Sequence, residues 1–154
     1  PRVSLLCFIG AGGLLGYYDT DGTFDRAQFV ENCDSFARSS KVQMYPGRDS
    51  VWILDGAAIH THPKIVHHLR GLGIVPIFLP VYCPFYNPIE YFFGYVKSAF
   101  KRFYVESSGR KNLIPFVAEM LRRFEKYSMC DVFEHCGWTV RSVFDPSKGL
   151  DEQM

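Results

Sequence analysis

The chain has 154 residues, of which 17 are Lys or Arg and 16 are Asp or Glu, so its formal net charge is +1. This length fits one domain of ~100–150 residues, and 47% hydrophobic residues with 21% charged residues exclude a disordered tail. No apolar run reaches the roughly 18–20 residues that span a bilayer, which excludes a membrane protein.

The first residues and the cysteines indicate in which cell compartment the protein is expected. Residues 1–16 lack a cationic stretch and begin without Met, so we expect no signal peptide and an origin inside a longer chain. Five cysteines without a Cys-x-x-Cys pair argue against a disulfide framework and favour a reducing, intracellular compartment. Cys130, His135 and Cys136 lie close in sequence, but zinc sites need four ligands at tighter spacing, and buried thiols are the simpler interpretation.

The first third of the chain predicts two strands and a helix. Val3–Ile9 and Leu14–Tyr18 are apolar runs separated by two adjacent glycines, which is typical of two strands joined by a tight turn. Turn residues follow, and Thr23 or Asp25 can cap a helix that ends near Arg38.

The rest of the chain predicts further strands alternating with helices. Val51–Leu54 is wholly apolar, as in a strand buried on both faces. Ile74–Leu79 is the next strand, and Pro76 favours a place near a sheet edge. Three helices are predicted, from Pro63 to about Arg70, from Asn87 to about Tyr104 and from Leu113 to Lys126. This order predicts one α/β domain over residues 1–154, with helices covering a mixed sheet.

Two acidic residues stand where ligand sites are common, and each has a simpler structural role. Asp55 directly follows the strand Val51–Leu54, and open α/β sheets place their ligand sites at such strand ends. A turn or helix cap would equally explain it. Glu90 follows Asn87 and Pro88 in a capping-box pattern, in which both side chains would only satisfy backbone donors.

Together, Asp55 and Glu90 lie in a specific context. The flanking segments are 52–60 (WILDGAAIH) and 79–90 (LPVYCPFYNPIE). This combination resembles the catalytic domain of mariner-type transposases, in the DDE, ribonuclease H-like superfamily, whose usual forms are Leu-Asp-Asn followed by His, then Leu-Pro-Pro-Tyr-Ser-Pro leading to Asn-Pro-Ile-Glu. The resemblance covers most of the chain and implies a ribonuclease H-like fold.

The resemblance also implies a metal site. Asp55 and Glu90 would be the second and third carboxylates that hold two Mg²⁺ or Mn²⁺ ions, since hard divalent ions bind oxygen ligands. Two ions about 4 Å apart stabilise the attacking and leaving oxygens of a phosphodiester displacement. Asn87 would hold the helix start, and His60 matches the histidine of the family. A polar helix-start role is the alternative for His60, and His62 is a second histidine able to bind metal.

Two departures from the family pattern bear on activity. The family carries its first aspartate on a central strand that precedes the one resembling Val3–Ile9, so we expect this strand to be missing here. Asp19 and Asp21 are the alternative source of that carboxylate. Gly56 replaces the usual Asn and removes a polar group. Three functions therefore stay open. The first is an active cut-and-paste transposase, and the second is a non-catalytic, decayed or co-opted remnant that keeps the fold and DNA binding. A nuclease of the same fold is the third.

Basic residues gather after Glu90. Residues 91–126 hold eight basic and three acidic side chains, whereas residues 1–55 hold five basic and seven acidic ones. Positive charge beyond the catalytic helix suits a DNA backbone, and a solvated basic face is the alternative. The predicted DNA contacts are Lys97, Lys101, Arg102, Arg110 and Lys111. We expect double-stranded DNA (transposon ends and target) as partner, a homo-oligomer as an option, and location in the nucleus of a eukaryote or otherwise in the cytoplasm.

Overall fold

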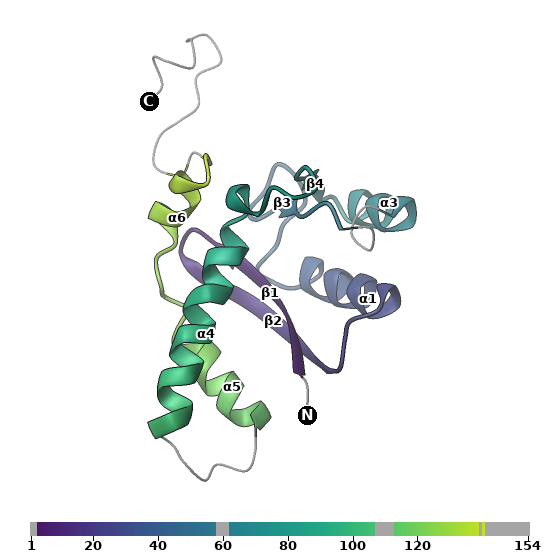
Figure 1. The fold of residues 1–154 in the computed structure, drawn as a ribbon. Coiled ribbons are helices and arrows are strands. Elements are labelled where there is room, and N and C mark those ends of the chain that lie inside the picture. Colours follow the sequence, from purple (N-terminus) through teal and green to yellow (C-terminus); the bar gives the residue numbers. More distant parts are fainter. Residues whose placement is uncertain (1–2, 58–61, 107–112, 139, 141–154) are drawn as a thin grey trace, which may run out of the picture.

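A computed structural model describes residues 3–57, 62–106, 113–138 and 140 (Figure 1). Its elements are β1 Val3–Gly10, β2 Gly13–Asp21, α1 Arg26–Ala37, β3 Val51–Leu54, α3 Pro63–Gly71, β4 Val75–Phe78, the 3₁₀ helix η1 Pro84–Tyr86, α4 Pro88–Glu106, α5 Leu113–Arg122 and α6 Cys130–His135. The predicted α/β class is confirmed. In this described part of the chain, no helix is both long and apolar enough to cross a membrane.

The described strands form two separate two-stranded sheets, whereas the sequence predicted one mixed sheet. β1 and β2 pair antiparallel, and β3 and β4 pair parallel. Within the described residues no ladder joins β1 or β2 to β3 or β4. Pro76 does lie in an edge strand, as predicted, since β3 is the only strand among the described residues that pairs with β4.

Helices cover both faces of the β1–β2 hairpin (Figure 1). Leu6 and Phe8 of β1 pack in a core cluster with Phe36 of α1, whereas Cys7, which points to the opposite face, packs in a second cluster with Phe92 of α4. Burial raises the pKa of the Cys7 thiol to about 12, so this thiol behaves as a small apolar group.

The turn between β1 and β2 depends on a glycine. Gly13 has a φ of +126°, and a Cβ built there would lie 2.5 Å from the carbonyl oxygen of Phe124. The same oxygen accepts a hydrogen bond from the Leu14 N–H at 2.9 Å. Only glycine allows the hairpin to approach this backbone so closely.

We expect Gly13→Val to lower the free energy of unfolding by about 3 kcal/mol, because backbone strain and a backbone overlap add. Gly12→Ala is the matched control, since nothing lies within 4 Å of a Cβ at Gly12. Urea unfolding of both variants measures the effect. Equal losses in the two variants would contradict this account of the turn.

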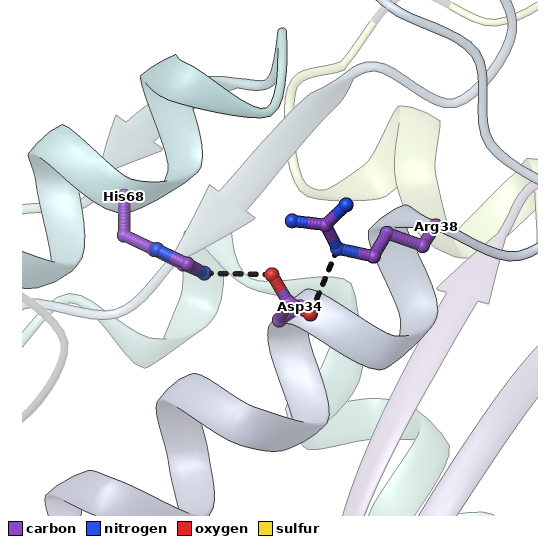
Figure 2. Close-up of polar contacts among 3 residues, drawn as sticks. All are labelled: Asp34, Arg38 and His68. Carbon is purple, nitrogen blue, oxygen red and sulfur yellow. Dashed lines mark hydrogen bonds and ion pairs between the residues drawn. The ribbon is translucent and has the colours of Figure 1, made fainter.

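A charged cluster links α1 to α3 (Figure 2). Asp34 Oδ2 accepts a hydrogen bond from Arg38 Nε at 2.9 Å, and Asp34 Oδ1 lies 3.0 Å from His68 Nε2, with which it forms a second hydrogen bond. The bond from Arg38 and, to a smaller extent, that from His68 hold the pKa of Asp34 below its usual range. A carboxyl with a lowered pKa stabilises the fold above its ordinary pKa, and this contribution disappears as the pH falls through the lowered value.

Replacing Asp34 by Asn should therefore lower the melting temperature at about pH 6, and the difference from wild type should shrink as the pH falls and the wild-type carboxyl becomes protonated. Glu31→Gln, on an exposed position of the same helix, is the control. Melting curves recorded from neutral to acidic pH provide the measurement. A difference between Asp34→Asn and wild type that stays constant with pH would contradict the assignment.

Candidate active site

A cavity of about 390 Å³ lies between β1 and β3. Residues 4–9 of β1 line one side of it, and residues 51–55, which include all of β3, line another. Residues of α1, α4 and α6 form further walls, among them Cys33, Phe93 and Phe133. The cavity therefore touches both sheets and both helical layers.

Asp55 comes to the cavity from the carboxyl end of β3. The preceding residues Trp52 and Leu54 pack in the core cluster around α1, which fixes the strand. The Ala57 N–H donates to Asp55 Oδ1 at 3.0 Å. Asp55 thus stabilises a turn, which was the alternative role considered for it from the sequence. The same bond holds its carboxylate at the end of β3.

Glu90 comes to the same cavity from the first turn of α4, together with Asn87. Asn87 is buried, and its Oδ1 accepts from the Ile89 N–H at 3.2 Å, so it caps the helix. In a full capping box the Glu90 side chain would accept from the Asn87 N–H. That N–H instead donates to the Pro84 carbonyl at 3.0 Å. Capping is therefore the work of Asn87, and Glu90 lies exposed at the cavity.

The structure gives a packing reason for Gly56. A Cβ at this position would lie 2.9 Å from the Leu79 carbonyl oxygen and 3.1 Å from Val81 Cγ2. The backbone after Asp55 thus packs against the loop that leads to α4. An Asn side chain here would require this loop to shift, so the departure from the family pattern reflects the local packing.

The other acidic residues separate into two groups. Asp19 and Asp21, the alternatives for the first carboxylate, lie in β2, where the strand extends beyond its predicted end, and neither lines the cavity. Asp49 does line it and has a φ of +55° just before β3. Asp49 was not among the residues predicted for the site, and its signal in the sequence is its place two residues before the apolar run Val51–Leu54.

No group of three or more His, Cys, Asp or Glu side chains is arranged to hold a metal ion among the residues that the structure describes. That statement covers Cys130, His135 and Cys136. His62 caps α3 through Nδ1, which accepts from the Lys64 N–H at 3.2 Å. His60 lies outside the described residues.

The predicted DNA-binding residues fall partly on α4. Lys97, Lys101 and Arg102 are exposed, and in the described ranges none of them forms an ion pair. Arg110 and Lys111 lie outside the described residues. Arg123 of the same basic segment lies over the ring of Phe103, 4.1 Å from its centroid, so its charge is partly engaged in a cation–π contact.

Comparison with protein families identifies the family of the chain. No curated protein matches the chain in sequence. The family model described as "DDE superfamily endonuclease" matches residues 1–113, a range that contains β1 to α4 and both Asp55 and Glu90. The chain belongs to the DDE superfamily endonuclease family.

Proposed function

We propose that residues 1–154 form the catalytic domain, ribonuclease H-like in fold, of a mariner-type transposase that cleaves DNA and joins the ends to a target. The observation that carries this proposal is that Asp55 and Glu90, from separate elements, line one cavity in a chain of the DDE superfamily endonuclease family. The substrate would be double-stranded DNA. We include in this proposal that the protein works as a homo-oligomer. It would act in the nucleus of a eukaryotic cell or otherwise in the cytoplasm.

The two carboxylates suit Mg²⁺ or Mn²⁺, because these ions prefer oxygen ligands. Such ions, when bound, neutralise charge that develops on the phosphodiester oxygens and activate the nucleophile. The chain's own contribution is positioning. β3 and the bond from the Ala57 N–H orient Asp55, and the Asn87 cap fixes the first turn of α4, from which Glu90 extends.

Lys97, Lys101 and Arg102 would bind the phosphate backbone beyond the carboxylates. They lie seven, eleven and twelve residues after Glu90 on α4. Lys97 and Lys101 share a helix face with Glu90. Their exposure without ion pairs among described residues leaves their charge available to DNA. Arg110, Lys111 and an auxiliary contact from His60 complete this part of the proposal.

The first carboxylate of the family would come from a strand between β1 and β3. Two observations support this. The described strands form two sheets rather than one, and the cavity lies between the strands that such a strand would join.

A non-catalytic remnant is the second candidate. It is favoured by the lack, among the described residues, of any group of three acidic or other ligand side chains able to hold a metal. Such a protein would keep the fold and DNA binding without cleavage.

Nicking of supercoiled plasmid tests the proposal. Residues 1–154 alone should nick slowly in Mg²⁺. A longer polypeptide, in which an apolar strand with one aspartate precedes residue 3, should nick at least about 10²-fold faster. The reason is that each 1.4 kcal/mol of metal-dependent stabilisation that is lost lowers the rate tenfold. The same polypeptide with Asn in that strand is the control. Equal rates for the Asp and Asn versions would favour the remnant, and rapid Mg²⁺-dependent nicking by residues 1–154 alone would refute the need for the added strand.

A further inference from the structure

An uncharged loop with exposed apolar side chains connects β4 to α4. Its residues 80–86 (PVYCPFY) include no acidic or basic side chain. Three of its apolar side chains are exposed, Val81 by 59%, Tyr82 by 93% and Phe85 by 53%. A single exposed apolar residue needs no explanation, but neighbouring ones on one short segment mark a contact surface. The packing of the core therefore does not account for this loop.

Tyr82 lies in the turn of this loop in a strained backbone conformation. Its φ is +64°, in the left-handed region that residues with a large side chain rarely adopt. Strained residues of this kind collect at functional sites, where the surrounding structure holds them in place. The ring of Phe85 meets that of Tyr86, with centroids 4.5 Å apart, whereas the Tyr82 side chain is almost fully exposed. The strain therefore presents the Tyr82 ring to solvent.

Both ends of the loop are fixed to the elements that carry the two carboxylates. At its start, the Leu79 N–H donates to the Leu54 carbonyl at 2.8 Å, and Asp55 is the next residue after Leu54. At its end, Asn87 caps α4, whose first turn carries Glu90. These bonds keep the loop beside both carboxylates. A substrate that reaches Asp55 and Glu90 therefore also meets the loop.

The composition of the loop selects the part of DNA that it can contact. Phosphates are bound above all by Lys and Arg, and residues 80–86 include neither. Aromatic rings instead stack on bases, and every base has a face for this contact. In a duplex the neighbouring bases cover these faces, so a base must leave the helix before a protein ring can stack on it. An exposed ring beside the carboxylates is thus suited to an unpaired base.

We propose that the ring of Tyr82 stacks on an unpaired DNA base next to the phosphate that reacts at Asp55 and Glu90. This inference rests on the proposed function for the presence of DNA, and it adds the form of the substrate, a duplex with a base out of the helix beside the reacting phosphate. Tyr82 is then a substrate-binding residue. Stacking on its ring replaces the base neighbours that are lost when the base leaves the helix.

Binding of DNA with one unpaired base tests the proposal without any cleavage. The probes are a duplex with 5-iodouracil paired to adenine and the same duplex with that 5-iodouracil as a single-base bulge. Fluorescence anisotropy with residues 1–154, in EDTA, gives both affinities. We expect the bulged duplex to bind at least about fivefold more tightly, and near-ultraviolet light should crosslink its iodouracil to Tyr82, as located by mass spectrometry. Absent binding, equal affinities or a crosslink that does not include Tyr82 would overturn the proposal.

Two substitutions of Tyr82 separate stacking from general apolar contact. Tyr82→Leu keeps an apolar side chain without a ring, and Tyr82→Trp keeps a ring. The Leu variant should lose the preference for the bulged duplex and bind the paired duplex within about twofold of wild type, whereas the Trp variant should keep the preference. Neither should alter the melting curve, because the side chain is exposed. Met44→Ala, at a residue exposed by 69% between α1 and β3, is the control and should change neither affinity. A preference that survives in Tyr82→Leu would contradict the proposal.

The outcomes also separate this inference from the proposed function. Equal binding of paired and bulged DNA, with the salt dependence expected for α4, would refute the stacking and leave DNA binding in place. Preference for the bulge without Mg²⁺-dependent nicking would support the stacking and count only against catalysis. Sedimentation velocity without DNA tests the other kind of partner. Self-association that Tyr82→Leu abolishes would show that the loop binds protein, and it would overturn the contact with a base.

Discussion

Asp55→Asn and Glu90→Gln should each lower Mg²⁺-dependent nicking by about 10³-fold in the polypeptide that carries the added aspartate strand. Each substitution removes a charged oxygen ligand, and the metal ions it holds supply several kcal/mol of transition-state stabilisation, at about 1.4 kcal/mol for each tenfold in rate. Both replacements keep the size of the side chain. The rate of conversion of supercoiled to nicked plasmid, at saturating protein, is the measurement.

Asp49→Asn is the matched control for these two variants. Asp49 lines the same cavity, and its φ of +55° is a conformation that Asn also tolerates. We assign no catalytic part to it, so this variant should nick within a factor of about three of the unmodified protein. DNA affinity should be equal in all three variants, which separates loss of chemistry from loss of binding. A fall of 10³-fold in Asp49→Asn as well would mean that general acidity of the cavity, and not a specific carboxylate pair, supports cleavage.

The triple variant Lys97→Ala, Lys101→Ala and Arg102→Ala should bind duplex DNA about 10²-fold more weakly near 0.1 M salt. Each phosphate contact contributes a slope of about −0.9 to the dependence of log affinity on log salt concentration. Removing three contacts should therefore make the slope shallower by roughly three, uniformly across DNA sequences. Fluorescence anisotropy of a labelled duplex, measured over a range of salt concentrations, tests both numbers.

A second triple variant controls for net charge. Arg26, Lys64 and Arg70 are exposed residues of α1 and α3, helices that lie away from α4 (Figure 1). Replacing these three by Ala removes the same charge, and it should leave the salt slope nearly unchanged. Equal losses of affinity in both triple variants would show that net charge decides binding and that α4 is only a solvated basic face.

Local sequence patterns predicted most of the elements and the position of the carboxylates. Hydrophobic runs gave β1 and β3, and Asp25 caps α1 in a capping box with Gln28 as the pattern indicates. Asn87 starts α4 as its sequence predicts. These features depend on neighbouring residues, so a single sequence contains the information. Motif context then paired Asp55 with Glu90, which the structure brings to one cavity.

Features that depend on distant contacts could not be predicted in this way. The reason for Gly56 is the approach of Leu79 and Val81, more than twenty residues later. The short helix α6, absent from the predicted elements, is tied to the β1–β2 turn through the bond from the Met129 N–H to the Ala11 carbonyl at 2.8 Å. The division into two sheets depends on which strands pair, β1 with β2 and β3 with β4, and not on the composition of any one strand. None of these contacts leaves a periodic signal in the sequence.

A crystal structure of residues 1–154 grown with Mn²⁺ tests most directly the central claim, that Asp55 and Glu90 form one metal site. We expect an anomalous peak in the cavity between β1 and β3, bound by oxygens of both residues, with the two carboxylates about 4–8 Å apart so that they share a metal pair. Manganese bound elsewhere, or carboxylates turned away from each other beyond that distance while Mn²⁺ is present, would contradict the claim.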